Sequence, residues 1–165
     1  MDFKKIIKER RSIKYFDEHH KLSKDEINEI FKHTLLSPTA FNLQHWRFLV
    51  IENNELRKKI QEVSFNQSQV TESSLLVIIT GDLDAWKKNP TKYWRNADKN
   101  VQTMMGDMIF NFYNHRKQMQ RDEVMRSCSM AAMTMMLSAK NLGYDSCPMD
   151  GFDFDAVSKL LNLPK

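Results

Sequence analysis

Leu75-Leu76-Val77-Ile78-Ile79-Thr80-Gly81 is the stretch of this sequence that decides the fold class. A short run of apolar and β-branched residues closed by a glycine is typical of a buried strand. The segment from Trp46 to Ile51 has the same character, so a second buried strand is expected there. The longer periodic segments have helical spacing, and the strands lie scattered between them. This pattern predicts an α+β fold, a small mixed sheet with helices on both faces.

Helical patterns extend outward from the two strands in both directions. Ser23 and Glu26 form a capping-box pattern that opens one helix, and Pro38 ends it. Further helices are expected before Arg10, after Asn53, along the apolar stripe of residues 101–112, over about residues 122–142, and after Asp153. Residues 144–147 are predicted to form a short strand, and residues 85–96 a loop or mobile excursion.

Length and composition set broad limits on the protein. Its 165 residues, 41% of them hydrophobic, fit one soluble domain over residues 1–165. The net charge of +4 is spread along the chain among acidic residues, so no nucleic-acid partner is expected. The longest apolar run, Leu75 to Ile79, is too short to span a membrane. The start of the chain lacks an apolar leader and the two cysteines lack paired spacing, which together predict a cytoplasmic protein.

The small number of glycines excludes several kinds of site. The chain has four glycines and contains no G-x-G-x-x-G fingerprint, P-loop or G-x-S-x-G turn. A bound phosphate would therefore depend largely on arginine and serine side chains. His19 and His20 have no third ligand nearby in the sequence, so no metal site is expected.

The segment Arg10-Arg11-Ser12-Ile13-Lys14 is the first candidate binding element. Arginine offers a planar fork of donors to a phosphate, and the serine hydroxyl adds another donor. In an extended segment residues 10, 12 and 14 point to the same side, so they would face one ligand together. Spacing alone favours the alternative, an exposed basic turn.

Two further segments have the composition of binding loops. The stretch from Ser37 to Trp46 joins a helix to a strand with small and amide side chains, which suit a flat heterocycle edged with N–H and C=O groups. In the stretch from Pro148 to Phe152, Gly151 lets the backbone approach a ligand closely. Each segment taken alone is also explained as an ordinary connection.

Together these motifs resemble the FMN-dependent nitroreductase family. R-R-S-x-K-x-F-D at residues 10–17, S-P-T-A-x-N-L-Q-x-W-x-F at 37–48 and C-P-M-D-G-F-D at 147–153 occur in the family's order, as does Phe65-Asn66-Gln67-Ser68-Gln69. The resemblance covers the chain from Phe3 to Pro164. It implies a three-layer α/β/α fold with a small, mostly antiparallel sheet, and an NAD(P)H-dependent FMN oxidoreductase.

The resemblance also implies a role for each matched residue. Arg10 and Ser12, with Arg11 beside them, match the contacts to the FMN phosphate and ribityl chain. Lys14 matches a cation near the N1/O2 edge of the isoalloxazine, where it would stabilise negative charge on the reduced ring.

Two more segments match residues that line the ring in the family. Asn66 stands at a ring or ribityl contact, and Gln69 stands where some members carry a lysine. Asp150 and Gly151 match the backbone donors to N5 and O4, on the face where hydride arrives.

The family is typically a homodimer with two FMN sites at the interface. Pro38, Thr39, Ala40 and Asn42 resemble the segment that reaches the FMN of the other subunit. The implied mechanism is ping-pong: NAD(P)H gives a hydride to N5 and leaves, and a small oxidised molecule such as a nitroaromatic or quinone takes its place. No side chain is expected to act as acid, base or nucleophile, so no catalytic residue is assigned.

The sequence also departs from the family pattern. Family members usually continue past the position of Pro164 with a further strand and a basic tail, so the resemblance implies that this C-terminal strand is absent. His45 stands where many members have proline, and a packed or solvent-facing histidine is favoured over one that titrates in a pocket. Trp86, Tyr93 and Trp94 are hypothesised to belong to a lid over the flavin.

Three rival interpretations of the function remain open. The first is a flavin-binding, vestigial or truncated family member without turnover. The second is a flavin enzyme of another branch, one that destroys its flavin or dehalogenates a substrate. A non-flavin interaction domain is the most remote, because it leaves the motifs unexplained.

Overall fold

The computed structural model describes residues 2–164. The elements follow one another as α1 (Phe3–Glu9), α2 (Lys24–Thr34), the 3-10 turn η1 (Ala40–Asn42), β1 (Trp46–Val50), α3 (Asn54–Glu62), α4 (Gln69–Glu72), β2 (Val77–Gly81), the 3-10 turn η2 (Lys92–Trp94), α5 (Lys99–Tyr113), α6 (Lys117–Asn141) and α7 (Phe154–Leu160). Among these residues, none of the helices combines the length and the apolar character that crossing a membrane requires.

Strands β1 and β2 pair with each other in antiparallel register. The N–H of Ile51 donates to the carbonyl of Leu76 over 2.9 Å at one end, and the N–H of Asp82 donates to the carbonyl of His45 over 2.8 Å at the other. Both predicted strands are thereby confirmed.

The predicted strand over residues 144–147 is wrong. Only Ser146 pairs there, in an isolated parallel bridge with Ser12. Pro148 follows two residues later and has no N–H to extend the ladder, which keeps the pairing short.

Helix boundaries follow local capping rules. In the capping box, the N–H of Ser23 donates to Oε2 of Glu26 over 2.8 Å, and the N–H of Glu26 donates to Oγ of Ser23 over 3.3 Å. Asp153 caps α7 as expected, and Asn53 caps α3; each side chain accepts a hydrogen bond from the backbone N–H three residues on. Helix α6 begins at Lys117 rather than near residue 122, because residues 117–121 are all good helix formers.

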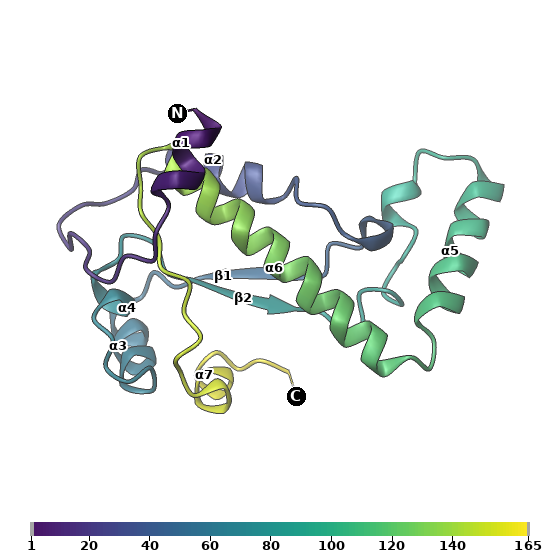
Figure 1. Cartoon of the computed structure of the whole chain (residues 1–165). Helices are drawn as coiled ribbons and strands as arrows, with labels where there is room; N and C mark the ends of the chain where they lie inside the picture. The colour runs from purple at the N-terminus through teal and green to yellow at the C-terminus, as the bar shows by residue number, and fades with distance from the viewer. Residues whose placement is uncertain (1, 165) are drawn as a thin grey trace. The chain divides into compact units, whose positions relative to one another are not determined.

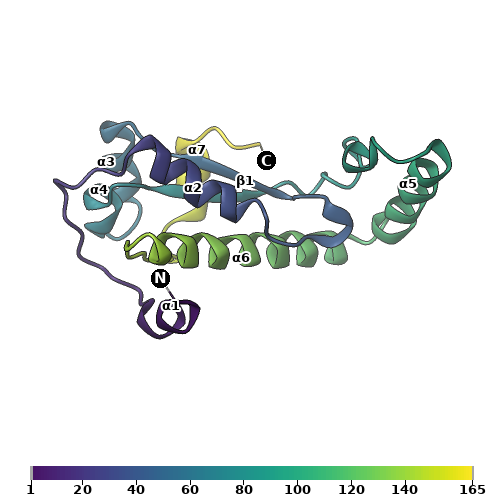
Figure 2. The ribbon, with the colours of Figure 1, turned by 90° about the horizontal axis from the view of Figure 1, so that it is seen from above.

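The described chain divides into two compact units, and β1, β2 and α6 contribute residues to both. The first comprises residues 2–33, 49–78 and 135–164. Its core is the cluster Ile51, Ile60, Val70 and Val157, around which α3, α4 and α7 meet. Helices α3 and α4 lie side by side in Figure 1 and again in the turned view of Figure 2.

Within this first unit the strands lie between two sets of helices. Helix α2 and the end of α6 lie on one side, and α3, α4 and α7 lie on the other (Figure 1). On the first side, Nδ1 of His33 and Oγ of Ser138 are hydrogen-bonded at 2.9 Å, which joins α2 to α6. This layering agrees with the predicted α+β class.

The second unit comprises residues 34–48 and 79–134. Its core is the cluster Leu43, Trp86, Ile109 and Tyr113. Residues 85–96 form turns, as predicted, but Trp86 is only 8% exposed and packs in this core. The aromatic side chain of Trp86 therefore anchors this segment.

That residues 1–165 form a single FMN-binding domain stays a prediction.

Candidate functional site

The basic N-terminal segment follows directly after α1. The N–H of Arg10 closes the helix by donating to the carbonyl of Ile6 over 2.9 Å, and the backbone of Arg10 is then extended (φ −59°, ψ 122°). Among the described residues, the side chains of Arg10, Ser12 and Lys14 form no hydrogen bond or ion pair within the protein. The segment thus offers two cations and a hydroxyl to a ligand.

A second serine accompanies this segment. Ser12 pairs with Ser146, and the N–H of Ile13 donates to the carbonyl of Ser146 over 3.2 Å. The hydroxyl of Ser146 is buried and has no partner among the described residues. A buried hydroxyl without a partner is costly unless water or a ligand satisfies it. Sequence reasoning missed Ser146, which only the chain pairing places beside Ser12.

The turn at Asp150 and Gly151 carries two backbone N–H groups that are not used in hydrogen bonds within the described part of the protein. The carbonyl of Asp150 accepts from the N–H of Phe152 over 3.2 Å, and the N–H of Asp153 donates to the carbonyl of Val63 over 2.9 Å. Across residues 2–164, the N–H groups of Asp150 and Gly151 find no protein acceptor. Two neighbouring donors are therefore available to a ligand that offers acceptors along one edge.

The turn at residues 65–69 lies against Gly151. Phe65 and Asn66 both adopt left-handed backbone conformations with φ of 53°, a conformation that is unfavourable for phenylalanine and tolerated better by asparagine. The side chain of Asn66 is exposed and forms no hydrogen bond within the described part of the protein. The side chain of Gln69 is 6% exposed and donates to Oε1 of Gln67 over 3.0 Å. Its contact with a cofactor stays a prediction.

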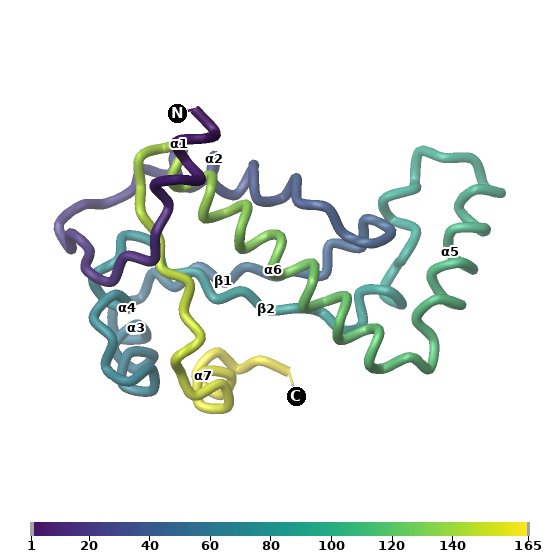
Figure 3. The backbone as a smooth tube through the Cα atoms, in the orientation of Figure 1, coloured from purple at the N-terminus to yellow at the C-terminus, as the bar shows by residue number. Residues whose placement is uncertain are grey.

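The first unit therefore brings together segments that are distant in the sequence. After α6 the chain passes the N-terminal segment and continues to α7, a course that the tube in Figure 3 makes easy to follow. On the way it pairs with Ser12 through Ser146 and receives a hydrogen bond from Gln67 at Gly151. Gln67 was not among the predicted site residues.

The predicted residues Pro38, Thr39, Ala40 and Asn42 lie in the second unit. Their loop is tight, because Phe41, Asn42 and Gln44 all have φ between 49° and 53°. Oγ1 of Thr39 accepts from the N–H of Gln44 over 3.0 Å and closes the loop. Such strained conformations persist only where surrounding contacts hold them.

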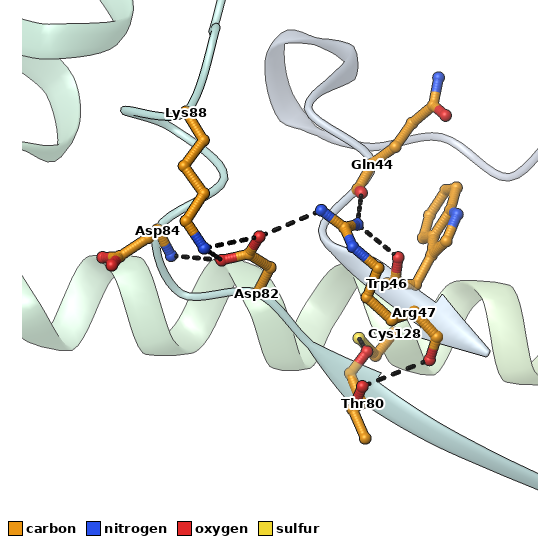
Figure 4. Close-up of polar contacts among 8 residues, drawn as sticks. All are labelled: Gln44, Trp46, Arg47, Thr80, Asp82, Asp84, Lys88 and Cys128. Carbon is orange, nitrogen blue, oxygen red and sulfur yellow. Dashed lines mark hydrogen bonds and ion pairs between the residues drawn. The ribbon is translucent and has the colours of Figure 1, made fainter. Parts of the chain in front are cut away.

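An arginine holds the end of this loop (Figure 4). Nη1 of Arg47 donates to the carbonyl of Gln44 over 3.0 Å, and Nη2 donates to Oδ2 of Asp82 over 3.0 Å. Nζ of Lys88 also donates to Asp82, over 3.1 Å to Oδ1. Burial by itself raises the pKa of Asp82, but the Lys88 hydrogen bond, the Asp84 N–H and the nearby cations outweigh it and lower the pKa. These contacts join the loop to the turn after β2, and the sequence did not predict them.

His45 is packed, in agreement with the favoured prediction. It is 2% exposed, and its ring meets that of Tyr113 edge-on with centroids 6.4 Å apart. Burial lowers the pKa of His45, while the carboxylates of Glu123 and Asp82 partly oppose this effect. Its Nδ1 has no partner among residues 2–164, so the neutral ring is the favoured form.

Comparison with known proteins agrees with the resemblance of the motifs. The family model described as "Nitroreductase family" matches residues 7–165. Protein DrgA of Synechocystis is 45% identical over 164 residues, which are 99% of this chain and 78% of DrgA. MhqN of Bacillus subtilis, described as an NAD(P)H nitroreductase, is 33% identical, with 98% of this chain and 82% of MhqN covered.

A solved structure of a related protein has the same fold. A protein of Exiguobacterium sibiricum, described as a nitroreductase and solved in complex with FMN, superimposes with a TM-score of 0.91 at 30% identity, covering 100% of this chain and 82% of that one. The family match spans nearly the whole chain, and the shared fold includes every segment described above. The chain therefore belongs to the nitroreductase family.

Proposed function

We propose that the protein is an FMN-dependent oxidoreductase that uses NAD(P)H to reduce small oxidised organic molecules such as nitroaromatics or quinones. The observation that carries the proposal is the set of free donors gathered in the first unit. They are the side chains of Arg10, Ser12 and Lys14 and the N–H groups of Asp150 and Gly151. The FMN bound by the Exiguobacterium protein and the description of MhqN support the same assignment.

The donor set fits the chemistry of FMN. Arg10 and Ser12, with Arg11 beside them, would hold the phosphate and ribityl chain, since a guanidinium fork and hydroxyls match phosphate oxygens. The unpartnered hydroxyl of Ser146 adds a donor on the same side of the bridge. Lys14 would place positive charge near the N1/O2 edge of the ring.

The other donors suit the opposite edge of the ring. The N–H groups of Asp150 and Gly151 would meet the acceptors N5 and O4, and Asn66 would add a side-chain amide. When bound, FMN supplies the two-electron chemistry, with NAD(P)H and the acceptor using the same space in turn. The protein binds and orients, so no side chain is assigned as acid, base or nucleophile.

We further propose a cytoplasmic homodimer in which Pro38, Thr39, Ala40 and Asn42 reach the FMN of the other subunit. Leu35 and Leu36, which precede this loop, are 50% and 78% exposed, as expected for apolar residues that a second subunit covers. Cys128 and Cys147 are both free thiols, in keeping with a reducing compartment. Light scattering during size-exclusion chromatography measures the assembly.

The test of the proposal is spectroscopic. The purified protein, supplied with FMN, is expected to show a bound-flavin absorption band that bleaches when NADPH or NADH is added without oxygen. Recovery of the band on adding a quinone or nitroaromatic would establish turnover, and parallel lines in double-reciprocal plots would support the ping-pong order. A bound flavin that neither nucleotide bleaches would instead favour the flavin-binding protein without turnover. Failure to bind FMN at all would refute the proposal.

A further inference from the structure

We propose that Gln67 is a positioning residue for the backbone donors of Asp150 and Gly151, acting through a hydrogen bond to the carbonyl of Gly151. The inference rests on the proposed function, because it assigns those two N–H groups to a flavin edge. Gln67 itself would touch no cofactor.

The side-chain amide of Gln67 spans two segments that are 84 positions apart in the sequence. Nε2 donates to the carbonyl of Gly151 over 2.8 Å and to the carbonyl of Ser64 over 3.1 Å. Both N–H bonds of the amide are thus used by backbone carbonyls. The contact ties the turn at residues 65–69 to the turn before α7.

The orientation of this amide is determined by its neighbours. Oε1 of Gln67 accepts from Nε2 of the buried Gln69 over 3.0 Å, so the oxygen faces Gln69 and the nitrogen faces Gly151. The backbone of Gln67 is held as well, because its carbonyl accepts from Nε2 of Gln61 over 3.2 Å. A side chain held at both ends imposes a direction on the carbonyl it meets.

The held carbonyl is connected to the free donors through the turn at residues 150–152. The carbonyl of Asp150 accepts from the N–H of Phe152, so residues 150–152 form one tight turn. The Gly151 carbonyl shares its peptide plane with the N–H of Phe152, which donates to the carbonyl of Asp150, and that carbonyl shares its plane with the N–H of Gly151. The N–H groups of Asp150 and Gly151 have no protein acceptor among residues 2–164. Donors oriented before the ligand arrives stabilise developing charge without reorganisation.

The glycine at position 151 is consistent with this close contact. A Cβ placed there would lie 3.3 Å from Nε2 of Gln67 and 3.6 Å from the ring of Phe65. Both neighbours belong to the 65–69 turn, so a side chain at position 151 would press against the hydrogen bond that holds the carbonyl.

The test compares Gln67→Glu with the wild-type protein. Glutamate has the same shape but no N–H to donate, and its oxygens repel the Gly151 carbonyl. The variant is expected to keep bound FMN, because the phosphate contacts lie elsewhere. Its flavin reduction potential should become more negative, and the rate of flavin reduction at saturating nucleotide should fall about tenfold. In the apo protein, amide exchange of residues 150–153 should become faster.

Gln120→Glu is the matched control, since Nε2 of Gln120 likewise donates to a backbone carbonyl, that of Tyr113, over 2.7 Å. It should leave the flavin potential and the exchange of residues 150–153 at wild-type values. Gln67→Leu, which also cannot donate, should repeat the effects of Gln67→Glu.

Three outcomes would overturn the inference. In the first, the wild type binds FMN and the Gln67 variants match its potential and exchange, so Gln67 does not position the donors. In the second, neither Gln67 variant retains native circular dichroism, which makes the residue a folding contact only. In the third, the wild type itself binds no FMN, and the inference then falls together with the proposed function.

Discussion

The phenol of Tyr144 donates a hydrogen bond to the carboxylate of Glu26. Glu26 is also the residue whose carboxylate accepts from Ser23 in the capping box of α2. One acidic side chain therefore joins the start of α2 to the segment that carries Ser146 and Gly151. This contact lies within the first unit and links its helical layer to the candidate site.

The first prediction concerns the pH dependence of this contact. The hydrogen bonds from Tyr144 and then from Ser23 lower the pKa of Glu26 from 4.5 to about 2. Because the pKa is lower in the folded state, the stabilisation is present above about pH 4.5 and is lost as the pH falls towards 2. Tyr144→Phe should therefore reduce the loss of stability between pH 5 and pH 2, measured by urea denaturation. An unchanged pH profile would contradict this assignment.

The second prediction concerns the phosphate contacts. Arg10→Ala should weaken FMN binding about 10- to 100-fold, because it removes hydrogen bonds between two charged groups. The affinity of Arg10→Lys for FMN should lie between those of the wild type and Arg10→Ala, since lysine keeps the charge but loses the planar fork. Flavin fluorescence titration measures both. Lys8→Ala, one cation earlier on α1, serves as the control, and an equal loss there would indicate a nonspecific effect of charge.

The third prediction concerns the ion pairs shown in Figure 4. Asp82→Asn should lower the free energy of unfolding by about 1 kcal/mol, a modest value because Arg47 and Lys88 are 49% and 62% exposed. Asp84→Asn is the matched control, since it removes only an exposed pair with Lys87. Denaturation curves of equal midpoint for the two variants would show that Asp82 holds the loop no more than any surface carboxylate.

The fourth prediction concerns packing at the end of β2. A Cβ on Gly81 would lie 2.1 Å from Cγ1 of Val124, so Gly81→Ala should cost about 1–3 kcal/mol of stability. Val124→Ala removes the clashing methyl group. The double variant should therefore be more stable than the sum of the two single effects implies. Strict additivity would mean that the backbone moves aside instead.

The fifth prediction uses the buried histidine. Burial lowers the pKa of His45 below 6.5, so protonation favours the unfolded state. Stability should then rise as the pH rises through about 6.5 and decline as it falls below that value. His45→Phe retains an aromatic ring against Tyr113 and should flatten this dependence between pH 5 and 7.5. A pH dependence that persists unchanged in His45→Phe would contradict this assignment.

The sequence by itself determined most of the local structure of this protein. The apolar run ending at Gly81, the capping box of Ser23 and Glu26, and the caps Asn53 and Asp153 all depend on neighbours along the chain. Such signals act over a few residues, so they can be recognised in the sequence alone. The order of the motifs was likewise enough to place the chain in its family.

Tertiary structure decided what depends on distant partners. Among residues 2–164, Ser146 forms an isolated bridge with Ser12, a partner 134 positions earlier in the sequence. The side chain of Trp86 packs against Tyr113 in a core. The polar residues around Trp86 in the sequence gave no sign of this burial. The proposed role of Gln67 depends on its hydrogen bond to the carbonyl of Gly151, a residue far along the chain. Contacts across such separations depend on how the helices and strands pack, and no local pattern in the sequence encodes that packing.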